Sequence, residues 1–436
     1  MNERDSEIME QLLVRAGYIC VRTSQDADLV ILNTCSIRAK AEQKVFSLLG
    51  QLRQQKEKRP ELRIAVAGCV AQQEGQHILR RMPHVDIIVG TQQFYQLPDM
   101  LQRLDQADSK QEICCTLDAS FSIPPFQKLL HDAPPSPAEP EFRKFVTIMQ
   151  GCNNFCSYCV VPATRGREIS RPVQDILEEV RLLVARGIRE ITLLGQNVNS
   201  YGCTNDVADQ PTGFADLLRM VAAIPGVQRL RFTSSNPQDL SVELVECFAE
   251  LDNLCPHFHL PVQSGSDAVL KKMNRKYSRD LYLEKVAALR SACPDIAIST
   301  DVIVGFPGET DEDFKQTMDL LETVRYHGSF SFKYSDRPNT RSTEFSDKVA
   351  ESIKSERLQR FQKRQDQISL EKNREYVGQT LEVMVEEIGS AKIKARTGSN
   401  HIVHFEDATE RSPGDLVKVT IIHAGKHSLN GELPSP

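Results

Sequence analysis

The sequence predicts an α/β protein in three parts: an N-terminal doubly wound parallel-sheet domain, a central partial (β/α)6 barrel and a small C-terminal all-β barrel. Short apolar runs alternate with helical stretches along residues 1–104, which indicates parallel strands with helices on both faces of a sheet. The alternation resumes near residue 145, with a longer spacing between successive strands. After Gly378 only short strands follow, as expected for a small barrel.

The N-terminal part begins with the amphipathic stretch DSEIMEQLLVRAG, a predicted helix that starts near Asp5 and ends at Gly17. A second helix, over IRAKAEQKVFSLLG, is predicted to end at Gly50. Short apolar runs predict three buried strands, at 28–35, 63–69 and 85–90.

The central part contains six candidate strands separated by helical stretches such as VQDILEEVRLLVARG. In a barrel of parallel strands the chemistry takes place at the carboxyl ends of the strands. The six strands are predicted at 145–150, 190–196, 229–234, 257–262, 297–306 and 328–334.

Domain boundaries follow from changes in composition. The segment HDAPPSPAEPEF is rich in proline and polar residues and predicts a linker. The last helical stretch before the β-rich end, 352–376, is highly charged. We therefore expect an N-terminal domain, a linker, a barrel domain and a C-terminal domain at 1–116, 117–140, 141–372 and 373–436.

Composition limits the class of protein. No stretch approaches the roughly 20 apolar residues of a membrane helix. The acidic start MNERDSEIME lacks the features of a secretory signal, so we expect a cytoplasmic protein that does not enter membranes. The net charge of −6 does not by itself suggest a nucleic-acid binder, so RNA would have to bind local patches. The 12 cysteines are expected to be thiols or metal ligands in a reducing compartment.

Three cysteines form the pattern C-x3-C-x2-C directly after the first predicted barrel strand. Cys152, Cys156 and Cys159 share one loop, so their thiolates suit three irons of a [4Fe-4S] cube and leave the fourth iron open to a small molecule. A structural zinc site would need a fourth ligand, and no nearby Cys or His completes one. Incidental cysteines are the alternative, and the position of the loop argues against it.

This loop resembles the signature of the radical-SAM superfamily. The resemblance implies that the open iron chelates the amino and carboxylate groups of S-adenosylmethionine (SAM). One electron then cleaves the sulfonium to give a 5′-deoxyadenosyl radical, which can remove hydrogen from an unactivated C–H bond. By the same resemblance, Tyr158 lies near the adenine of SAM.

Further motifs resemble the methylthiotransferase family within that superfamily. NTCSIR and VVPATRGRE are similar to the branch that acts on N6-dimethylallyladenosine in tRNA, and RTGSNHIVHF resembles the TRAM domain, an RNA-binding barrel. The motifs are NTCSIR (33–38), GCVAQQEG (68–75), GCNNFCSYCVVPATRGRE (151–168), LLGQNVNSYG (193–202), HLPVQSGSDAVLKKMNRKYS (259–278) and DVIVGFPGET (301–310).

The family resemblance implies a second [4Fe-4S] cluster held by three N-terminal cysteines, of which Cys35 and Cys69 match two. Each follows a predicted strand, where α/β sheets bind ligands. The first cysteine of the family precedes a pattern that this chain enters at Met1, so its strand and cysteine are absent from the sequence. We favour a truncated or misplaced start. Alternatively Cys20 supplies the ligand, although it precedes its strand and should lie at the wrong end of the sheet.

Other candidates for SAM binding end the predicted barrel strands, where polar groups and glycines can approach a ligand. Each of them could equally be an ordinary strand–loop turn. Arg165 and Arg167 suit a cofactor carboxylate or RNA phosphate, or they are solvated charges. The candidates are Gly195, Gln196, Asn197, Ser234, Gln263 and Gly305.

The resemblance implies a tRNA methylthiotransferase that acts on adenosine 37, next to the anticodon. One SAM would donate its methyl group to sulfur on the N-terminal cluster, and a second would generate the radical that abstracts the C2 hydrogen. The expected partners are a tRNA anticodon stem-loop, a low-potential electron donor such as flavodoxin or ferredoxin, and a sulfur donor. A monomer is the default. The alternatives are methylthiolation of threonylcarbamoyl-adenosine or of a ribosomal-protein aspartate, and a non-enzymatic iron–sulfur scaffold.

Overall fold

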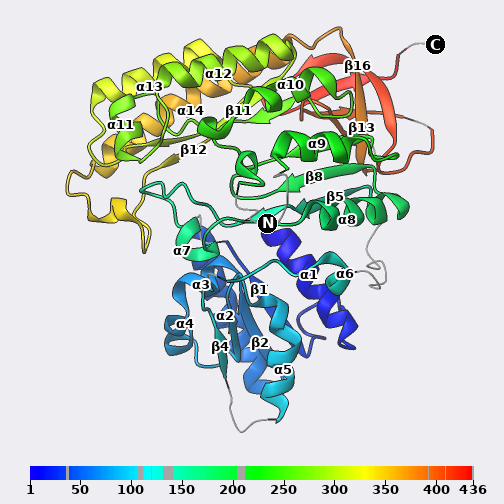
Figure 1. The fold of residues 1–436 in the computed structure, drawn as a ribbon, viewed down its shortest axis with the longest axis vertical. Helices are drawn as coiled ribbons and strands as arrows, with labels where there is room; N and C mark the ends of the chain where they lie inside the picture. Colours follow the sequence, from blue (N-terminus) through cyan, green and yellow to red (C-terminus); the bar gives the residue numbers. More distant parts are fainter. Residues whose placement is uncertain are drawn as a thin grey trace.

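The computed structural model describes residues 1–35, 39–106, 111–118, 120–130, 141–203, 212–390, 392–407 and 409–434. A four-stranded domain at the N-terminus lies against one side of the central half-barrel, and a small closed barrel at the C-terminus lies at one end of it (Figure 1).

The N-terminal sheet is parallel, with its strands in chain order: β1 (Leu29–Asn33), β2 (Arg63–Ala67), β3 (Ile87–Val89) and β4 (Glu112–Cys114). Helices α1 (Asn2–Arg15) and α5 (Leu97–Gln106) pack on one face. The other face is covered by α2 (Ala39–Lys58), α3 (Cys69–Glu74) and α4 (Gln76–Arg81). Helices on both faces confirm the doubly wound prediction.

Two details of this domain differ from the sequence-based expectation. Helix α2 continues through Gly50 to Lys58, because a glycine is tolerated within a helix when its neighbours Leu49 and Leu52 keep a buried stripe. Strand β4 was not predicted, because its three residues are too few to show a period.

The central domain holds six parallel strands in two sheets. The first sheet contains β5 (Arg143–Thr147), β8 (Glu190–Leu194) and β9 (Arg229–Phe232). The second contains β10 (His257–His259), β11 (Ala297–Val304) and β12 (Gly328–Lys333), and a bridge from Leu230 to Leu254 joins the two sheets. This arrangement is the predicted partial barrel.

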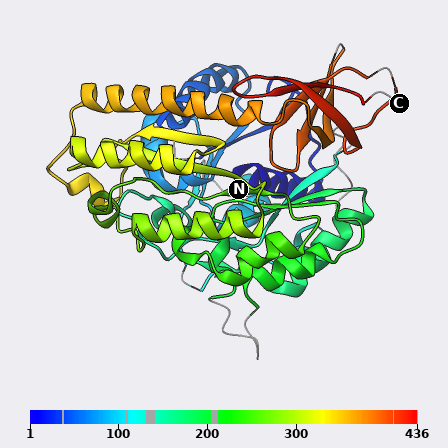
Figure 2. The ribbon, with the colours of Figure 1, turned by 90° about the horizontal axis from the view of Figure 1, so that it is seen from above.

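Helices cover the outer side of these strands (Figure 2). Along β11 Thr300, Val302 and Val304 are buried, whereas the alternate residues Asp301 and Ile303 face the inside of the half-barrel and are half-buried. The main outer helices are α8 (Val173–Ala185), α9 (Phe214–Ala222), α10 (Val242–Glu250), α12 (Arg279–Ala292), α13 (Asp311–Val324) and α14 (Glu351–Arg374).

Shorter elements connect these layers. Within the segment predicted as a linker, helix α6 packs on α1 and α8. The short elements are α6 (Phe126–Leu130), β6 (Met149–Gln150), α7 (Val161–Arg165), β7 (Ile169–Ser170), α11 (Asp267–Lys272), η1 (Phe94–Gln96), η2 (Val198–Ser200), η3 (Pro237–Asp239) and η4 (Arg341–Glu344).

The C-terminal domain is a closed five-stranded barrel, as predicted. Arg231 of β9 fixes it to the half-barrel by donating hydrogen bonds of 2.9 Å to the carbonyl oxygens of Thr397 and Gly398. The strands are β13 (Thr380–Ile388), β14 (Ile393–Thr397), β15 (Ile402–Phe405), β17 (Leu429–Glu432) and β16 (Leu416–Ala424), in their order around the barrel.

Candidate active site

The C-x3-C-x2-C loop lies at the carboxyl end of the first barrel strand, between β6 and α7. Gly151 forms its entrance with φ +82°, and a side-chain carbon there would lie 2.0 Å from the carbonyl oxygen of Arg167. Only glycine fits such a position. The Gly151 N–H donates to Oε1 of Gln196 at 2.5 Å, so the loop is joined to the end of β8.

Hydrogen-bond donors lie near all three thiols of the loop. Asn154 lies 3.6 Å from Sγ of Cys152, Arg275 Nη1 lies 3.4 Å from Sγ of Cys156, and the Val161 N–H lies 3.5 Å from Sγ of Cys159.

Burial raises the pKa of Cys152. Burial also raises the pKa of Cys159 to about 12, and the charge of the neighbouring Cys156 adds to this rise. Partly buried thiols with raised pKa values are not spontaneous nucleophiles; they become thiolates when they bind metal.

The three thiols suit a cluster better than a single ion. Among the described residues, no group of three His, Cys, Asp or Glu side chains converges closely enough to hold one metal ion. A single zinc requires all its sulfur ligands about 2.3 Å from one point. In a cube each thiolate binds a different iron, so the three sulfurs stay further apart, and three cysteines on one loop can hold it.

Aromatic rings lie beside the cysteine loop. Tyr158 is partly buried, and its ring centroid lies 6.4 Å from that of Phe306 in an edge-on arrangement. Phe306 follows Gly305 at the end of β11. Gly305 has φ +68°, and its N–H donates to Oε1 of Glu309 at 2.9 Å. The structure therefore places Tyr158 and Gly305, both predicted to bind SAM, on the same side of the loop.

Buried polar atoms gather at the ends of β8 and β9. Oδ1 of Asn197 and Nε2 of Gln196 are buried, and so are Oγ of Ser235 and Oε1 of Glu168, yet none has a hydrogen-bond partner within the described part of the chain. Native proteins rarely bury polar atoms without partners, so this group points to a polar ligand. The residues thus fit the amino acid and ribose groups of SAM.

Three predicted SAM contacts remain. Gly195 follows β8, where a side-chain carbon would lie 2.4 Å from Cγ of Met149. The other two are turn positions at positive φ. Ser234 has φ +72°, and its carbonyl oxygen accepts the Val198 N–H at 3.0 Å. Gln263 has φ +70°, and its N–H donates to the Asp301 carbonyl oxygen at 2.8 Å. Side chains held at positive φ often mark functional sites, so both residues remain candidates.

Glu168 was missed by the sequence analysis. Its carboxylate accepts a 2.6 Å hydrogen bond from Ser200, and its N–H donates to Asn153 in the cysteine loop at 3.2 Å. Burial raises the pKa of Glu168 to about 7. Sequence alone did not indicate this role, because a glutamate that follows two arginines resembles a solvated charge. The same holds for Arg275, which is distant in sequence from Cys156.

The two predicted N-terminal cluster ligands, Cys35 and Cys69, meet at the carboxyl ends of β1 and β2. A hydrogen bond with Cys35 lowers the pKa of Cys69 to about 6 against the effect of burial, and the charge of Arg165 also lowers it. Gly68 lets the ends of β1 and β2 approach each other, because a side-chain carbon at this position would lie 2.2 Å from Oδ1 of Asn33. Cys20 is exposed and interacts with Glu10, in the second half of α1. Cys35 interacts with Met1, at the opposite end of that helix. Cys20 therefore lies away from Cys35.

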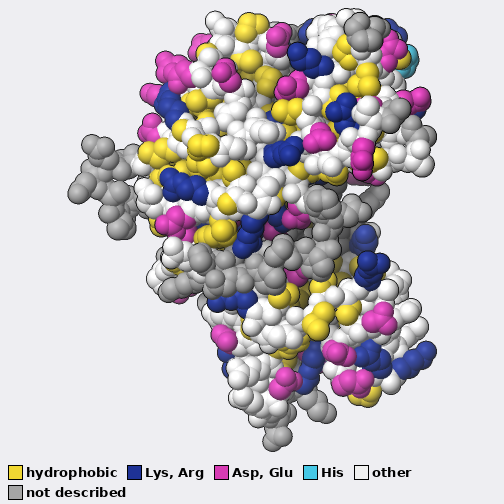
Figure 3. Space-filling view, turned by 90° about the vertical axis from the view of Figure 1, so that its right-hand side faces the viewer, with side chains coloured by type: hydrophobic (Ala, Val, Ile, Leu, Met, Phe, Trp, Pro, Cys, Tyr) yellow, Lys and Arg dark blue, Asp and Glu magenta, His cyan; other side chains and the backbone are white. Residues whose placement is uncertain are grey.

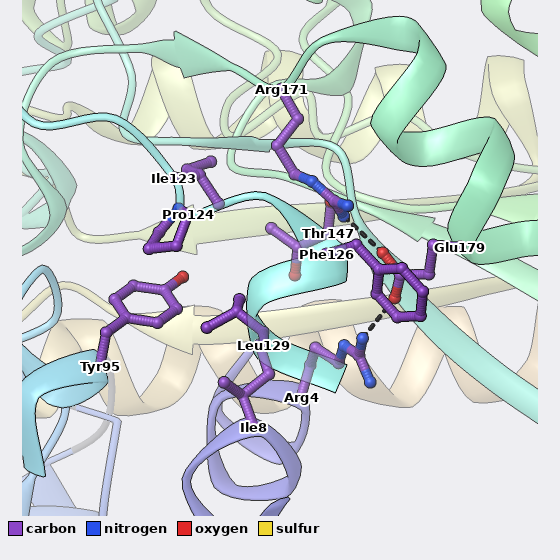
Figure 4. Close-up of a pocket in the computed structure, with 10 residues that line it drawn as sticks. All are labelled: Arg4, Ile8, Tyr95, Ile123, Pro124, Phe126, Leu129, Thr147, Arg171 and Glu179. Atoms are coloured by element: carbon purple, nitrogen blue, oxygen red, sulfur yellow. Dashed lines mark hydrogen bonds and ion pairs between the residues drawn. The ribbon is translucent and has the colours of Figure 1, made fainter. Parts of the chain in front are cut away.

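A small cavity of about 20 Å³ separates α1 from the barrel (Figure 4). Arg4 and Arg171 both bind the buried carboxylate of Glu179, the latter at 2.7 Å. A cavity of this size holds about one water molecule, so it belongs to the joint between domains and not to a cofactor site.

Comparison with known proteins assigns the three parts. The radical SAM superfamily matches residues 146–321, the uncharacterized protein family UPF0004 matches 1–90, and the TRAM domain matches 374–433. The tRNA-2-methylthio-N(6)-dimethylallyladenosine synthase of Desulfotalea psychrophila is 58% identical, over 99% of this chain and 96% of that protein. The chain belongs to this synthase family.

Other comparisons agree. The synthase of the same name from Syntrophus aciditrophicus is 47% identical, over 99% of this chain and 92% of its own. A solved structure of the radical SAM methyltransferase TsrM from Kitasatospora setae has a TM-score of 0.52 at 13% identity, over 88% of this chain and 72% of that one. This likeness shows the fold alone. Within the described residues of this synthase family member, no helix is long and apolar enough to cross a membrane.

Proposed function

We propose that this chain converts N6-dimethylallyladenosine at position 37 of tRNA, next to the anticodon, into its 2-methylthio derivative. The observation that carries the proposal is the cysteine loop, which lies beside a group of buried, unpartnered polar atoms at the carboxyl face of the half-barrel. Membership of the synthase family supports the same substrate.

In this proposal Cys152, Cys156 and Cys159 hold the [4Fe-4S] cluster that binds SAM. The cluster and SAM together supply a methyl donor and, after one-electron cleavage of SAM, a group that removes the C2 hydrogen. Gln196 and Asn197 would orient SAM through their unpartnered amide atoms. Tyr158 would exclude water beside the adenine.

Cys35 and Cys69 would hold the second [4Fe-4S] cluster, which would supply the sulfur for the bond to C2. Arg165 contacts Cys69 from α7, which begins two residues after Cys159. One chain segment therefore connects the two cysteine sites.

The purine is stacked within the anticodon loop, so it has to leave the stack to reach the site. On the face in Figure 3, Lys and Arg are interspersed with Asp and Glu among the described residues, so RNA would bind through local contacts. The TRAM barrel and helix α14 would hold the stem-loop. The protein would act as a monomer in the cytoplasm. A low-potential donor such as flavodoxin or ferredoxin would supply electrons, and a sulfur donor would supply the sulfur.

The test is mass spectrometry of nucleosides after incubation of the anaerobically reconstituted protein with SAM, reductant, sulfide and tRNA that carries dimethylallyladenosine. We expect the 2-methylthio nucleoside from the native chain and none from Cys152→Ala. Asn154→Ala is a control, because it removes only a donor at 3.6 Å from the same thiol. Product on threonylcarbamoyl-adenosine alone, or SAM that stays intact, contradicts the proposal.

A further inference from the structure

Two phenylalanines are exposed on the inside of the half-barrel. Phe330 is 56% exposed and Phe332 38% exposed, both on the edge strand β12. In the parallel register they stand beside Asp301 and Ile303 of β11, which face the inside. Lys333, on the opposite side of β12, hydrogen-bonds to Ser355 of the outer helix α14 at 3.3 Å. Both rings therefore face the interior of the half-barrel.

This aromatic surface is continuous with the cysteine loop. Ile303 packs in one apolar cluster with Tyr158 and Phe306, the rings next to the predicted SAM site. Inward-facing residues on a strand repeat every second residue, or about 7 Å. The row of Asp301 and Phe330 thus lies one step further from the loop than the row of Ile303 and Phe332.

The polar groups beside Phe330 are the side chains of His259, Asp301 and Ser299. His259 lies edge-on to the ring at 6.0 Å between centroids. Its Nε2 lies 3.5 Å from the half-buried carboxylate of Asp301, and its Nδ1 lies 3.0 Å from the hydroxyl of Ser299. The inward positions of β10 to β12 contain no Lys or Arg. A ligand group with its own carboxylate would be repelled here, whereas an uncharged apolar group could bury both rings.

We propose that Phe330, Phe332 and Asp301 form the specificity site for the N6 substituent of the target adenosine. The inference rests on the proposed function and names how its substrate is selected. The C2 atom has to lie at the SAM site, and the N6 substituent is attached at C6, on the other side of N1 from C2. The dimethylallyl group then packs on the two phenylalanines. Asp301 excludes the carboxylate of a threonylcarbamoyl group.

The experiment measures equilibrium binding by fluorescence anisotropy, which requires no turnover. Three anticodon stem-loops differ only at position 37: adenosine, dimethylallyladenosine or threonylcarbamoyl-adenosine. The proteins are the native chain, Phe330→Ala, Phe330→Leu and Asp301→Asn, with Met220→Ala as a control. Met220 is an exposed apolar residue on the outer helix α9.

We expect the native chain to prefer dimethylallyladenosine over adenosine by about 10- to 100-fold, the range of small apolar groups in a pocket. Phe330→Ala should lose most of this preference with unchanged affinity for the adenosine RNA. Phe330→Leu should keep part of it, and Met220→Ala all of it. Asp301→Asn should improve binding of the threonylcarbamoyl RNA alone.

The inference is wrong if Phe330→Ala keeps the preference of the native chain, or if it weakens all three RNAs equally. In either case the proposed function stands as long as the 2-methylthio product forms. A native chain that shows no preference and forms no product on dimethylallyladenosine overturns both. Circular dichroism of each variant confirms folding, because the substituted side chains are exposed or half-buried.

Discussion

Arg165 of the barrel domain donates a hydrogen bond of 2.5 Å to the carboxylate of Asp5 in the N-terminal helix, and both side chains are buried. Arg165 also donates to Oδ1 of Asn2 at 3.1 Å and contacts Cys69. Burial would lower the pKa of Arg165, but Asp5 and Cys69 raise it overall. The guanidinium therefore holds the two cysteine sites in a fixed relation.

Arg165→Ala should destabilise the protein strongly, because it leaves the carboxylate of Asp5 buried without its guanidinium partner. Loss of one member of a buried pair costs about 3–5 kcal/mol. Arg53→Ala is the control, since its pair with Glu57 is 66% and 63% exposed and should contribute under about 1 kcal/mol. Urea unfolding gives both values. Equal effects of the two substitutions would show that the Asp5 contact adds nothing.

Substitutions at the two cysteine sites should have distinct effects on iron content and on reactivity. Each [4Fe-4S] cluster adds about four irons per chain. Cys156→Ala should abolish SAM cleavage, whereas Cys69→Ala should leave SAM cleavage intact and abolish methylthiolation. Iron analysis after anaerobic reconstitution, with an assay for 5′-deoxyadenosine, tests both. Loss of SAM cleavage in Cys69→Ala would contradict independent sites.

Gly151→Ala should prevent assembly of the first cluster. Its side-chain carbon would meet the Arg167 carbonyl at 2.0 Å, so the loop would have to move. Gly187→Ala is a matched control, because Gly187 has φ +93° with open space around it. Left-handed backbone alone costs about 1–2 kcal/mol. Iron content should fall only in Gly151→Ala, and a fall in both variants would assign the effect to strain in the backbone.

The sequence was sufficient for most of the parallel strands and for the cysteine loop. Alternation of apolar runs predicted β1, β2 and β3 and all six barrel strands, because buried parallel strands leave a strong apolar signal. The cysteine spacing predicted the loop after β6, because three ligands of one cluster must be close in sequence to share a loop.

Contacts between distant segments could not be predicted. Arg275 lies beside Cys156 although 119 residues separate them. Glu168 acquires its raised pKa only because folding buries it beside Ser200. Phe330 alternates with polar residues as any half-buried strand would, and only the register with Asp301 shows which side it faces. Partners of this kind depend on tertiary structure, which has no local period.

Arg231→Met should loosen the C-terminal barrel. The substitution removes the hydrogen bonds to the carbonyls of Thr397 and Gly398, and it leaves the buried carboxylate of Glu190 without its 3.0 Å partner. We expect faster amide exchange across residues 396–400 and a loss of about 3–5 kcal/mol. Arg189→Met is the control, because Arg189 spans the same two domains but is half-exposed. Unchanged exchange in Arg231→Met would show that apolar packing alone holds the barrel.

Glu168 should make the stability of the SAM-free protein depend on pH. Burial raises its pKa from 4.5 to about 7, so folding favours the protonated carboxyl. Its contribution to the free energy of unfolding is complete below pH 4.5 and is lost as pH rises through about 7. Glu168→Gln should remove this decline, which urea unfolding at about pH 5 and about pH 8 would detect. Ser200→Ala should move the decline to higher pH, because the Ser200 hydrogen bond lowers this pKa. If the free energy of unfolding depends on pH in the same way in the native chain and in Glu168→Gln, the Glu168 carboxylate is solvated. Glu168 would then not be a buried group of the site beside the cysteine loop.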